Sequence, residues 1–526
     1  MIARSYYLTT PIYYVNSVPH LGTAYTTIAA DALARYRRMC GDDVFFLTGL
    51  DEHGQKVAQA AEENDSTPQE WVDSIAPKFL DTWAMLDISN DDFIRTTEER
   101  HIEGAQRFLE VLKDRGDIYQ GHYEGWYCVP DETYWTDDQL AEDKMCPACG
   151  RPLEFIREDN WFFRLSAYQE RLLEHYERCE REGRPFIQPE TRRNEVLSFV
   201  RGGLKDLSIS RTTFTWGIPL PFDSEHVMYV WFDALLNYVT AVGYGADGTP
   251  AFSGPRAHYW PAQYHFVGKD IIRFHCVIWP AMLMAAGLPL PETVFAHGFL
   301  LTKGEKMSKS KGNAMAPADL VGKFGVDAYR YYFLRDVQFG ADGSISMESM
   351  IQRYNGDLAN DWGNLCSRLF NMAEKYVGGL APSLPDATLE SEADAGIKSR
   401  AAALPGAYAE AMKSLDYAGA LEAAWELVKD VNRYIETEAP WNLAKSGEDE
   451  RLSDVLAIAL EAVRISALFT APVMPRTSAE VWRRLGLGDI LEVRDLDAAA
   501  AWGGLVPGSP VVKGDPLFPR IYDEER

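Results

Sequence analysis

The first fifty residues constrain the fold more than any other stretch of the chain. Residues 6–14 are apolar and rich in aromatic side chains, residues 22–39 show helical spacing, and residues 44–49 form a second apolar run that ends in glycine. A strand, a helix and a strand in this order predict a βαβ unit and therefore a parallel sheet. Ligands bind at the carboxyl ends of such strands. His20 and residues 51–54, which follow the two predicted strands, therefore mark the expected site.

The rest of the chain divides into segments of different character. Residues 55–116 have helical character, residues 117–165 are dense in Trp, Tyr, Cys and Pro, and further strands are expected at 264–267 and 293–298. From about residue 350 onward, Ala- and Leu-rich patterns predict a helical bundle. The predicted segments are 1–116 and 227–300 for the two halves of the sheet domain, 117–226 for an insertion, 301–350 for a loop region, and 351–526 for the bundle with a C-terminal tail.

Composition and charge limit the class of protein. The chain has 526 residues, of which 46% are hydrophobic, so several packed domains are expected. No run of eighteen apolar residues predicts a transmembrane helix, and no secretory signal begins the chain, so we expect a cytoplasmic protein without membrane contact. The net charge is −26, and residues 351–526 carry 18 Lys and Arg against 28 Asp and Glu. Any contact with nucleic acid must therefore depend on a few side chains and be sensitive to salt.

Two short motifs carry groups suited to phosphate chemistry. Residues 19–23 (PHLGT) place His20 and Thr23 at a predicted helix start, where an imidazole, a hydroxyl and backbone N–H groups can face an anion. Residues 306–310 (KMSKS) place Lys306 and Lys309 on a small-residue loop that can close over a polyphosphate. The alternatives are a capping threonine with a structural histidine for the first motif and a solvated basic turn for the second.

Three of the seven cysteines form a zinc-knuckle pattern. Cys128 is followed three positions later by Asp131, and Cys146 by Cys149. Three thiolates and one carboxylate make an acceptable tetrahedral zinc site, which would be structural because it leaves no open position. The alternative is a degenerate knuckle without metal. The odd cysteine count argues against a disulfide framework.

An aromatic segment at residues 229–238 places Trp231, Leu235 and Tyr238 on one helix face. Such a stripe is usually plain core. Its neighbour at 266–275 again runs from strand through glycine to helix, which places polar groups at a sheet edge.

The two phosphate motifs, in this order and at this separation, resemble the signature motifs of the class I aminoacyl-tRNA synthetases. Further segments extend the resemblance over nearly the whole chain to the bacterial methionyl-tRNA synthetases: residues 10–16 (TPIYYVN), 49–54 (GLDEHG), 268–270 (GKD), 438–441 (EAPW) and the segment around Trp231. The second histidine of the first motif is Thr23 here, a variant that also occurs among the methionine enzymes. The chain departs from related zinc-bearing enzymes at Asp131, where a fourth cysteine is common.

The resemblance implies a fold, an activity and roles for single residues. The fold is an α/β Rossmann-like catalytic domain split by an insertion with the knuckle, followed by an α-helical anticodon-binding bundle. The activity is ATP- and Mg²⁺-dependent joining of L-methionine to tRNA(Met), expected here in a monomer. Catalytic residues would be His20, Thr23, Lys306 and Lys309. ATP would be held by these four and by Gly22, Lys269 and Asp270. Methionine would be held by Ile12, Tyr14, Asp51, Trp231, Leu235, Tyr238 and His275. The anticodon would be contacted by Asn364, Arg368 and Trp441, and zinc by Cys128, Asp131, Cys146 and Cys149.

Two other functions remain open on the sequence. One is a catalytically inactive homologue that acts as a tRNA-binding module. The other is a different nucleotidyl transferase on the same fold. His20, Asp51, Lys306 and Lys309 are all present, which favours the active enzyme.

Overall fold

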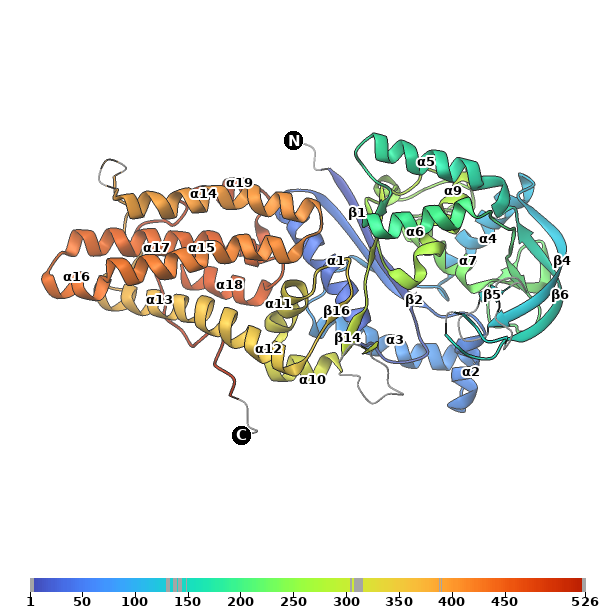
Figure 1. The fold of residues 1–526 in the computed structure, drawn as a ribbon, viewed down its shortest axis with the longest axis horizontal. Helices are drawn as coiled ribbons and strands as arrows, with labels where there is room; N and C mark the ends of the chain where they lie inside the picture. The colour runs from blue at the N-terminus through green and yellow to red at the C-terminus, as the bar shows by residue number, and fades with distance from the viewer. Residues whose placement is uncertain are drawn as a thin grey trace.

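The computed structural model describes residues 4–128, 133–135, 140, 144–147, 149–302, 305–306, 316–386, 388 and 390–522. The chain forms an α/β half, which holds the strands, and an elongated helical half beside it (Figure 1). No helix in these ranges is long and apolar enough to cross a bilayer.

A six-stranded, fully parallel sheet forms the centre of the α/β half. Its order is β3-β2-β1-β12-β13-β7. The strands are β1 (Ser5–Tyr14), β2 (Asp43–Asp51), β3 (Asp92–Arg95), β7 (Ile187–Gln188), β12 (Tyr264–Gly268) and β13 (Thr293–His297). Helix α1 (Leu21–Met39) connects β1 to β2. The predicted βαβ unit and the split parallel sheet are confirmed, because β12 returns to pair with β1 after a long excursion of the chain.

Two strands of this sheet differ from the sequence expectation. Strand β3 interrupts the region expected to be helical between α3 (Pro68–Met85) and α4 (Glu99–Asp114). It has only four residues, too few for a period-2 pattern to be recognised. The buried Ile94 side chain anchors this strand in the core. Strand β7 lies in the range predicted as an insertion but forms the far edge of the main sheet. The segment boundaries stay a prediction.

The excursion from the main sheet builds smaller antiparallel sheets. Strands β5 (Thr133–Trp135), β4 (Ile118–Cys128), β6 (Glu154–Phe163) and β8 (Leu207–Ser208) form one in that order. Strands β10 (Pro219–Leu220), β11 (Asp223–Met228) and β9 (Ser210–Arg211) form another. Helices α5 (Gln169–Arg181) and α6 (Glu190–Arg201) lie beside β7 in the chain.

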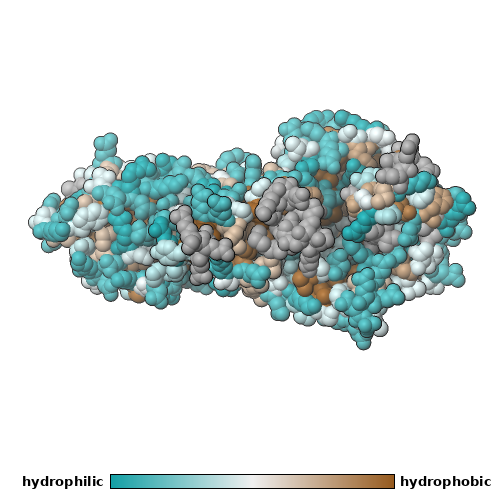
Figure 2. Space-filling view, turned by 60° about the horizontal axis from the view of Figure 1, so that its bottom comes forward, coloured by the Kyte–Doolittle hydropathy of each residue, from teal (hydrophilic) through white to brown (hydrophobic). Residues whose placement is uncertain are grey.

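The helical half is built around one buried helix. Helix α17 (Asp449–Thr470) is buried along almost its whole length from Leu452 onward. Around it are α13 (Asn364–Tyr376), α14 (Glu392–Lys413), α15 (Tyr417–Glu438), α16 (Pro440–Ser446) and α18 (Pro475–Arg484). The predicted bundle is confirmed. A view of one face shows that its surface is mostly hydrophilic (Figure 2), as expected when the apolar side chains fill the core.

A buried arginine joins the two halves. Arg330, on α11 (Val326–Asp336), donates hydrogen bonds to Asp31 of α1 and to the backbone carbonyl of Val473. Neither charged side chain is exposed. The Tyr417 hydroxyl also donates to the carbonyl of Ala29 on α1. The helix that carries the first motif therefore contacts the bundle directly.

Candidate active site

His20 caps the helix that follows the first strand. It precedes α1, and its Nδ1 atom accepts hydrogen bonds from the backbone N–H groups of Gly22 (3.0 Å) and Thr23 (3.3 Å). A Cβ atom on Gly22 would lie only 3.0 Å from the imidazole, so glycine makes room for the ring. Because Nδ1 accepts, the proton of the neutral ring lies on Nε2. The exposed imidazole therefore presents an N–H donor at a helix N-terminus, where anions are favoured.

Thr23 completes the same cap. Its hydroxyl donates to the His20 carbonyl (2.8 Å) and accepts from the His20 N–H (3.1 Å). The hydroxyl and the two amides expected to face phosphate thus hold the histidine in this structure. The structure therefore contains the threonine cap that the alternative interpretation expects. The same cap orients the imidazole, as a role in phosphate binding would also require. The roles of Gly22 and Thr23 in ATP binding stay predictions.

A narrow, partly open cavity brings together six of the seven residues predicted to bind methionine. It has a volume of about 10 Å³, roughly the room for one water molecule, and is lined by Pro11, Ile12, Asp51, Trp231, Ala234, Leu235, Tyr238 and His275. The lining comes from the carboxyl-terminal parts of β1 and β2, from α7 (Val230–Leu235), from α8 (Asn237–Thr240) and from the π-helical turn Phe274–Ile278. Tyr14 lies beside the lining, with its ring edge-on to Trp231 at 6.0 Å.

Phe274, which the sequence did not single out, packs against the lining residue Trp231. Its ring stacks on Trp231 with centroids 3.9 Å apart and an interplanar angle of 10°. Turns of π-helix are frequent at functional sites because they re-aim side chains. In the sequence, only the position of Phe274 next to His275 indicates that it lies near the methionine site.

The hydrogen-bonded pair of Tyr238 and His275 in the cavity wall is electrically neutral. The Tyr238 hydroxyl lies 2.8 Å from His275 Nε2, and His275 Nδ1 lies 3.1 Å from the Ile271 carbonyl. The carbonyl requires N–H at Nδ1, so Nε2 accepts from the tyrosine. Burial lowers the pKa of His275 to about 4, so the ring carries no charge at neutral pH. Asp51, 2% exposed, supplies a carboxylate to the lining. The cavity thus suits an apolar, polarisable side chain next to a cationic group.

The structure describes only part of the predicted ATP site around residues 268–270 and 306–309. Lys269 forms an ion pair with Asp342 at 2.7 Å, and Asp270 follows β12. Gly268 allows this turn, because a Cβ there would lie 2.5 Å from the Asp270 carboxylate. The backbone of Lys306 belongs to β15 (Glu305–Lys306), paired with β14 (Leu300–Thr302). The Lys306 side chain and all of Lys309 lie outside the described residues.

Three cysteines of the insertion meet at one point. The Sγ atoms of Cys128, Cys146 and Cys149 all lie within 4.8 Å of one another, and those of Cys128 and Cys149 are 3.5 Å apart. None of the three forms a disulfide. Thiolates around a tetrahedral zinc ion lie about 3.8 Å apart at the usual Zn–S distance, so this donor set fits zinc. Asp131, the predicted fourth ligand, lies outside the described residues.

The predicted anticodon residues lie near one end of the bundle. Asn364 begins α13 and is exposed. Arg368, one turn later, pairs with Glu436 of α15 at 2.6 Å. Its guanidinium also lies 5.6 Å from the centroid of the half-buried Trp441 ring. The structure therefore brings Arg368 and Trp441 together.

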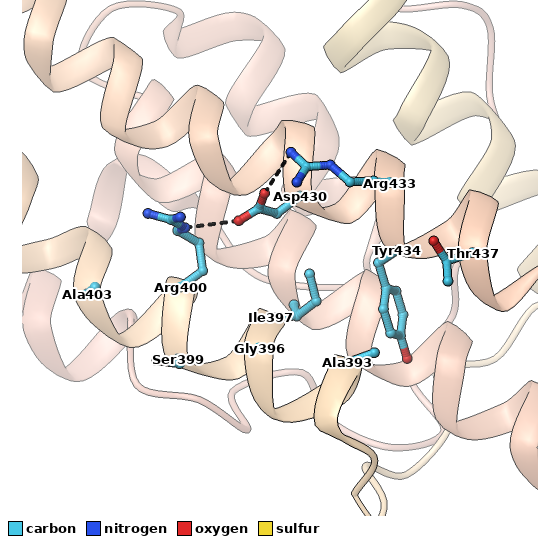
Figure 3. A pocket seen from close by; sticks show the side chains of 10 residues that line it. All are labelled: Ala393, Gly396, Ile397, Ser399, Arg400, Ala403, Asp430, Arg433, Tyr434 and Thr437. Atoms are coloured by element: carbon cyan, nitrogen blue, oxygen red, sulfur yellow. Dashed lines mark hydrogen bonds and ion pairs between the residues drawn. The ribbon is translucent and has the colours of Figure 1, made fainter.

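A larger and more open hollow lies between α14 and α15, and none of the three predicted anticodon residues lines it (Figure 3). Its arginines are compensated: Arg400 pairs with Asp430 and Glu426, and Arg433 pairs with Asp430. The hollow therefore offers no uncompensated charge to a ligand.

Known proteins match the chain in both halves. The family model for class I tRNA synthetases (M) matches residues 6–370, and the model for the anticodon-binding domain of methionyl-tRNA ligase matches residues 384–526. The methionine–tRNA ligase of Thermotoga maritima is 50% identical over 98% of this chain and 80% of its own length. That of Streptomyces coelicolor is 49% identical over 99% and 98%.

A solved structure agrees with these matches. Mycobacterium tuberculosis methionyl-tRNA synthetase in complex with methionyl-adenylate superimposes with a TM-score of 0.92 and 43% sequence identity, and covers 98% of this chain and 100% of that one. The likeness extends from the parallel sheet to the helical half. The chain therefore belongs to the class I methionyl-tRNA synthetases, the methionine–tRNA ligases.

Proposed function

We propose that the cavity at the carboxyl ends of β1 and β2 is the methionine site of this ligase. The observation that carries the proposal is the convergence of residues from distant parts of the chain on one small cavity with a neutral aromatic wall and a buried carboxylate. Asp51 anchors the α-ammonium group of methionine. The rings of Trp231, Tyr238 and His275 surround the thioether, which packs well against aromatic edges.

In adenylate formation, side chains of the two phosphate motifs and of residues 269–270 surround ATP. The methionine carboxylate attacks the α-phosphorus, and the bond to the β,γ-pyrophosphate breaks. His20 donates from Nε2–H to the phosphate oxygens as charge moves onto them. Lys306 and Lys309 neutralise the leaving pyrophosphate when their loop closes, and Mg²⁺ accompanies ATP. Asp270 and Lys269 hold the nucleoside, which requires Lys269 to exchange its present partner Asp342.

Transfer to tRNA is the second step. The 2′-hydroxyl of the terminal adenosine attacks the carbonyl carbon of the adenylate, and AMP leaves. Asn364, Arg368 and Trp441 contact the anticodon at the other end of the molecule. Stacking on Trp441 matters more than phosphate attraction here, because residues 351–526 are net acidic.

Zinc has a structural role in this proposal. Cys128, Asp131, Cys146 and Cys149 would hold the ion and fasten the end of the β4–β6 hairpin. Elemental analysis of protein purified without chelator should give one zinc per chain, and Cys146→Ser should lower that content. A zinc content near zero would contradict the site. The monomeric state and the cytoplasmic location also stay predictions, and light scattering of the purified protein tests the former.

The activity is tested by ATP–pyrophosphate exchange with each of the twenty amino acids, followed by charging of tRNA(Met). We expect exchange with methionine and subsequent transfer. Exchange with leucine or isoleucine but not methionine would overturn the pocket assignment. No finding favours the inactive homologue, which would give no exchange with any amino acid.

A further inference from the structure

A buried carboxylate behind the methionine cavity holds two histidines. Asp233 is completely buried, and its Oδ2 atom lies 2.7 Å from Nδ1 of His53. Its Oδ1 atom lies 2.7 Å from Nε2 of His101. The three residues come from α7, from the segment after β2 and from α4. Each carboxylate oxygen thus accepts a hydrogen bond from a different part of the fold.

Both imidazoles are also held on their far sides. His101 Nδ1 lies 2.9 Å from the Thr240 hydroxyl, and the His53 ring lies edge-on to Trp216 at 5.4 Å. Trp216 in turn binds the backbone on either side of His53: its indole N–H donates to the Glu52 carbonyl, and its own carbonyl accepts from the Gly54 N–H. The loop after β2 therefore has little freedom to move.

The carboxylate is charged and depends on its two partners. Burial alone would raise the pKa of Asp233, but His53 and His101 outweigh it, and the pKa is lowered. No lysine or arginine pairs with Asp233 in the described ranges of the chain. A buried charge is tolerated only with such hydrogen-bonded partners, so loss of either imidazole must disturb the arrangement.

The network joins two elements that line the cavity, α7 and the end of β2. Asp233 lies two positions after Trp231 and two before Leu235 on α7, and such a step rotates a side chain by about 200° around the helix. Asp233 therefore points away from the cavity that Trp231 and Leu235 line. His53 lies two positions after Asp51, which lines the same cavity.

We propose that Asp233, His53 and His101 form a positioning network that sets the separation between Asp51 and the aromatic wall and thereby the affinity for methionine. This inference rests on the proposed methionine site. It makes Asp233 a positioning residue, because it touches neither substrate nor reacting atoms. Displacements below an ångström matter in a cavity this small, since binding requires the ammonium anchor and the side-chain wall to be met at once.

The test is Asp233→Asn, assayed by pyrophosphate exchange. The amide keeps the shape but places an N–H group against one of the imidazole donors. We expect the KM for methionine to rise about ten- to a hundredfold, with the KM for ATP within about twofold of wild type. The matched control is Glu461→Gln, which alters another fully buried carboxylate, paired with Arg464 in the helical half. It should lower the melting temperature and leave both KM values unchanged.

A second variant covers the case in which Asp233→Asn does not fold. His101→Gln retains a donor for Asp233 and should raise the KM for methionine less than His101→Ala does. If Asp233→Asn folds with a methionine KM within twofold of wild type, or if His101→Gln and His101→Ala match wild type, the network serves stability alone and the inference is wrong. Absence of methionine-dependent exchange in the wild-type protein would instead refute the proposed function.

Discussion

The methionine cavity and the anticodon face, formed by Asn364, Arg368 and Trp441, differ in how their polar groups are buried and bonded. In the cavity, the polar groups are buried and bonded to one another, as in the pair of Tyr238 and His275. On the anticodon face, Arg368 is bonded to Glu436, a side chain that is 59% exposed. The cavity walls are therefore held by their own contacts and leave little space between them, so methionine must part them on binding. The anticodon face must instead exchange an internal ion pair for contacts with RNA.

The difference follows from the ligands. A small amino acid can be distinguished from similar ones only by fixed walls, because one methylene group contributes about 1–3 kcal/mol of discrimination. A splayed RNA base offers a large stacking surface, which a ring at the protein surface can use. An exposed ion pair contributes little to stability, so exchanging it for RNA contacts costs little.

The largest effect is expected from Asp51→Asn. Loss of the buried counter-charge for the α-ammonium should cost about 3–5 kcal/mol, or roughly 10²- to 4 × 10³-fold in kcat/KM for methionine. Pyrophosphate exchange at varied methionine concentration measures it. An effect below tenfold would mean that the ammonium group is anchored elsewhere and that the buried carboxylate does not define the cavity.

Trp441→Ala should have the next largest effect, and only on tRNA. Loss of one stacked base costs roughly 1–3 kcal/mol, about five- to a hundredfold in charging efficiency. Pyrophosphate exchange should be unchanged. Because Trp441 also packs partly against the core, the melting temperature is measured alongside. Equal losses in both reactions would show that the ring is a core residue and not a stacking platform.

Glu436→Gln should improve tRNA charging, whereas Trp441→Ala should impair it. The variant releases Arg368 and removes one negative charge from a net acidic face. Exposed ion pairs contribute up to about 1 kcal/mol, so the KM for tRNA should fall by at most about fivefold. Asp386→Asn, which removes an exposed charge that accepts hydrogen bonds from the nearby Thr388, serves as the control for charge alone. A rise in the KM of Glu436→Gln would mean that the ion pair itself presents Arg368 to the RNA.

The smallest effect concerns pH. An ordinary histidine titrates near 6.5, whereas burial lowers the pKa of His275 to about 4. The unfolded chain therefore takes up this proton first, so the contribution of His275 to stability is complete above pH 6.5 and declines as the pH falls toward 4. In the folded protein the His275 ring stays neutral over most of that range. Methionine affinity, measured by tryptophan fluorescence, should vary by less than twofold between pH 8 and 5.5, and its loss in step with a group titrating near 6.5 would contradict a neutral wall.

Much of this contrast could be predicted from the sequence, because it lies in local patterns. The alternation of apolar runs with a helix predicted β1, α1 and β2, and the stripe of Trp231, Leu235 and Tyr238 predicted one wall of the cavity. The motif spacing and the quoted segments identified the family. These signals need only neighbours along the chain.

What could not be predicted depends on long-range packing. The stacking of Phe274 on Trp231 joins residues 43 positions apart through a π-helical turn that no periodicity announces. The binding of Asp233 to His53 and His101 requires three elements to meet, and an isolated buried carboxylate has no sequence signature. The edge strand β7 is only two residues long and is defined by its partner β13.

The most direct test of independent sites is a double-mutant cycle in aminoacylation. Tyr238→Phe removes the donor to His275 in the cavity, and Trp441→Ala removes the stacking ring on the anticodon face. The two sites share no partner among the described residues, so the losses in kcat/KM should add within about 0.5 kcal/mol. A coupling above about 1 kcal/mol would contradict the account, because it would mean that the anticodon face alters a cavity whose walls are held by their own contacts.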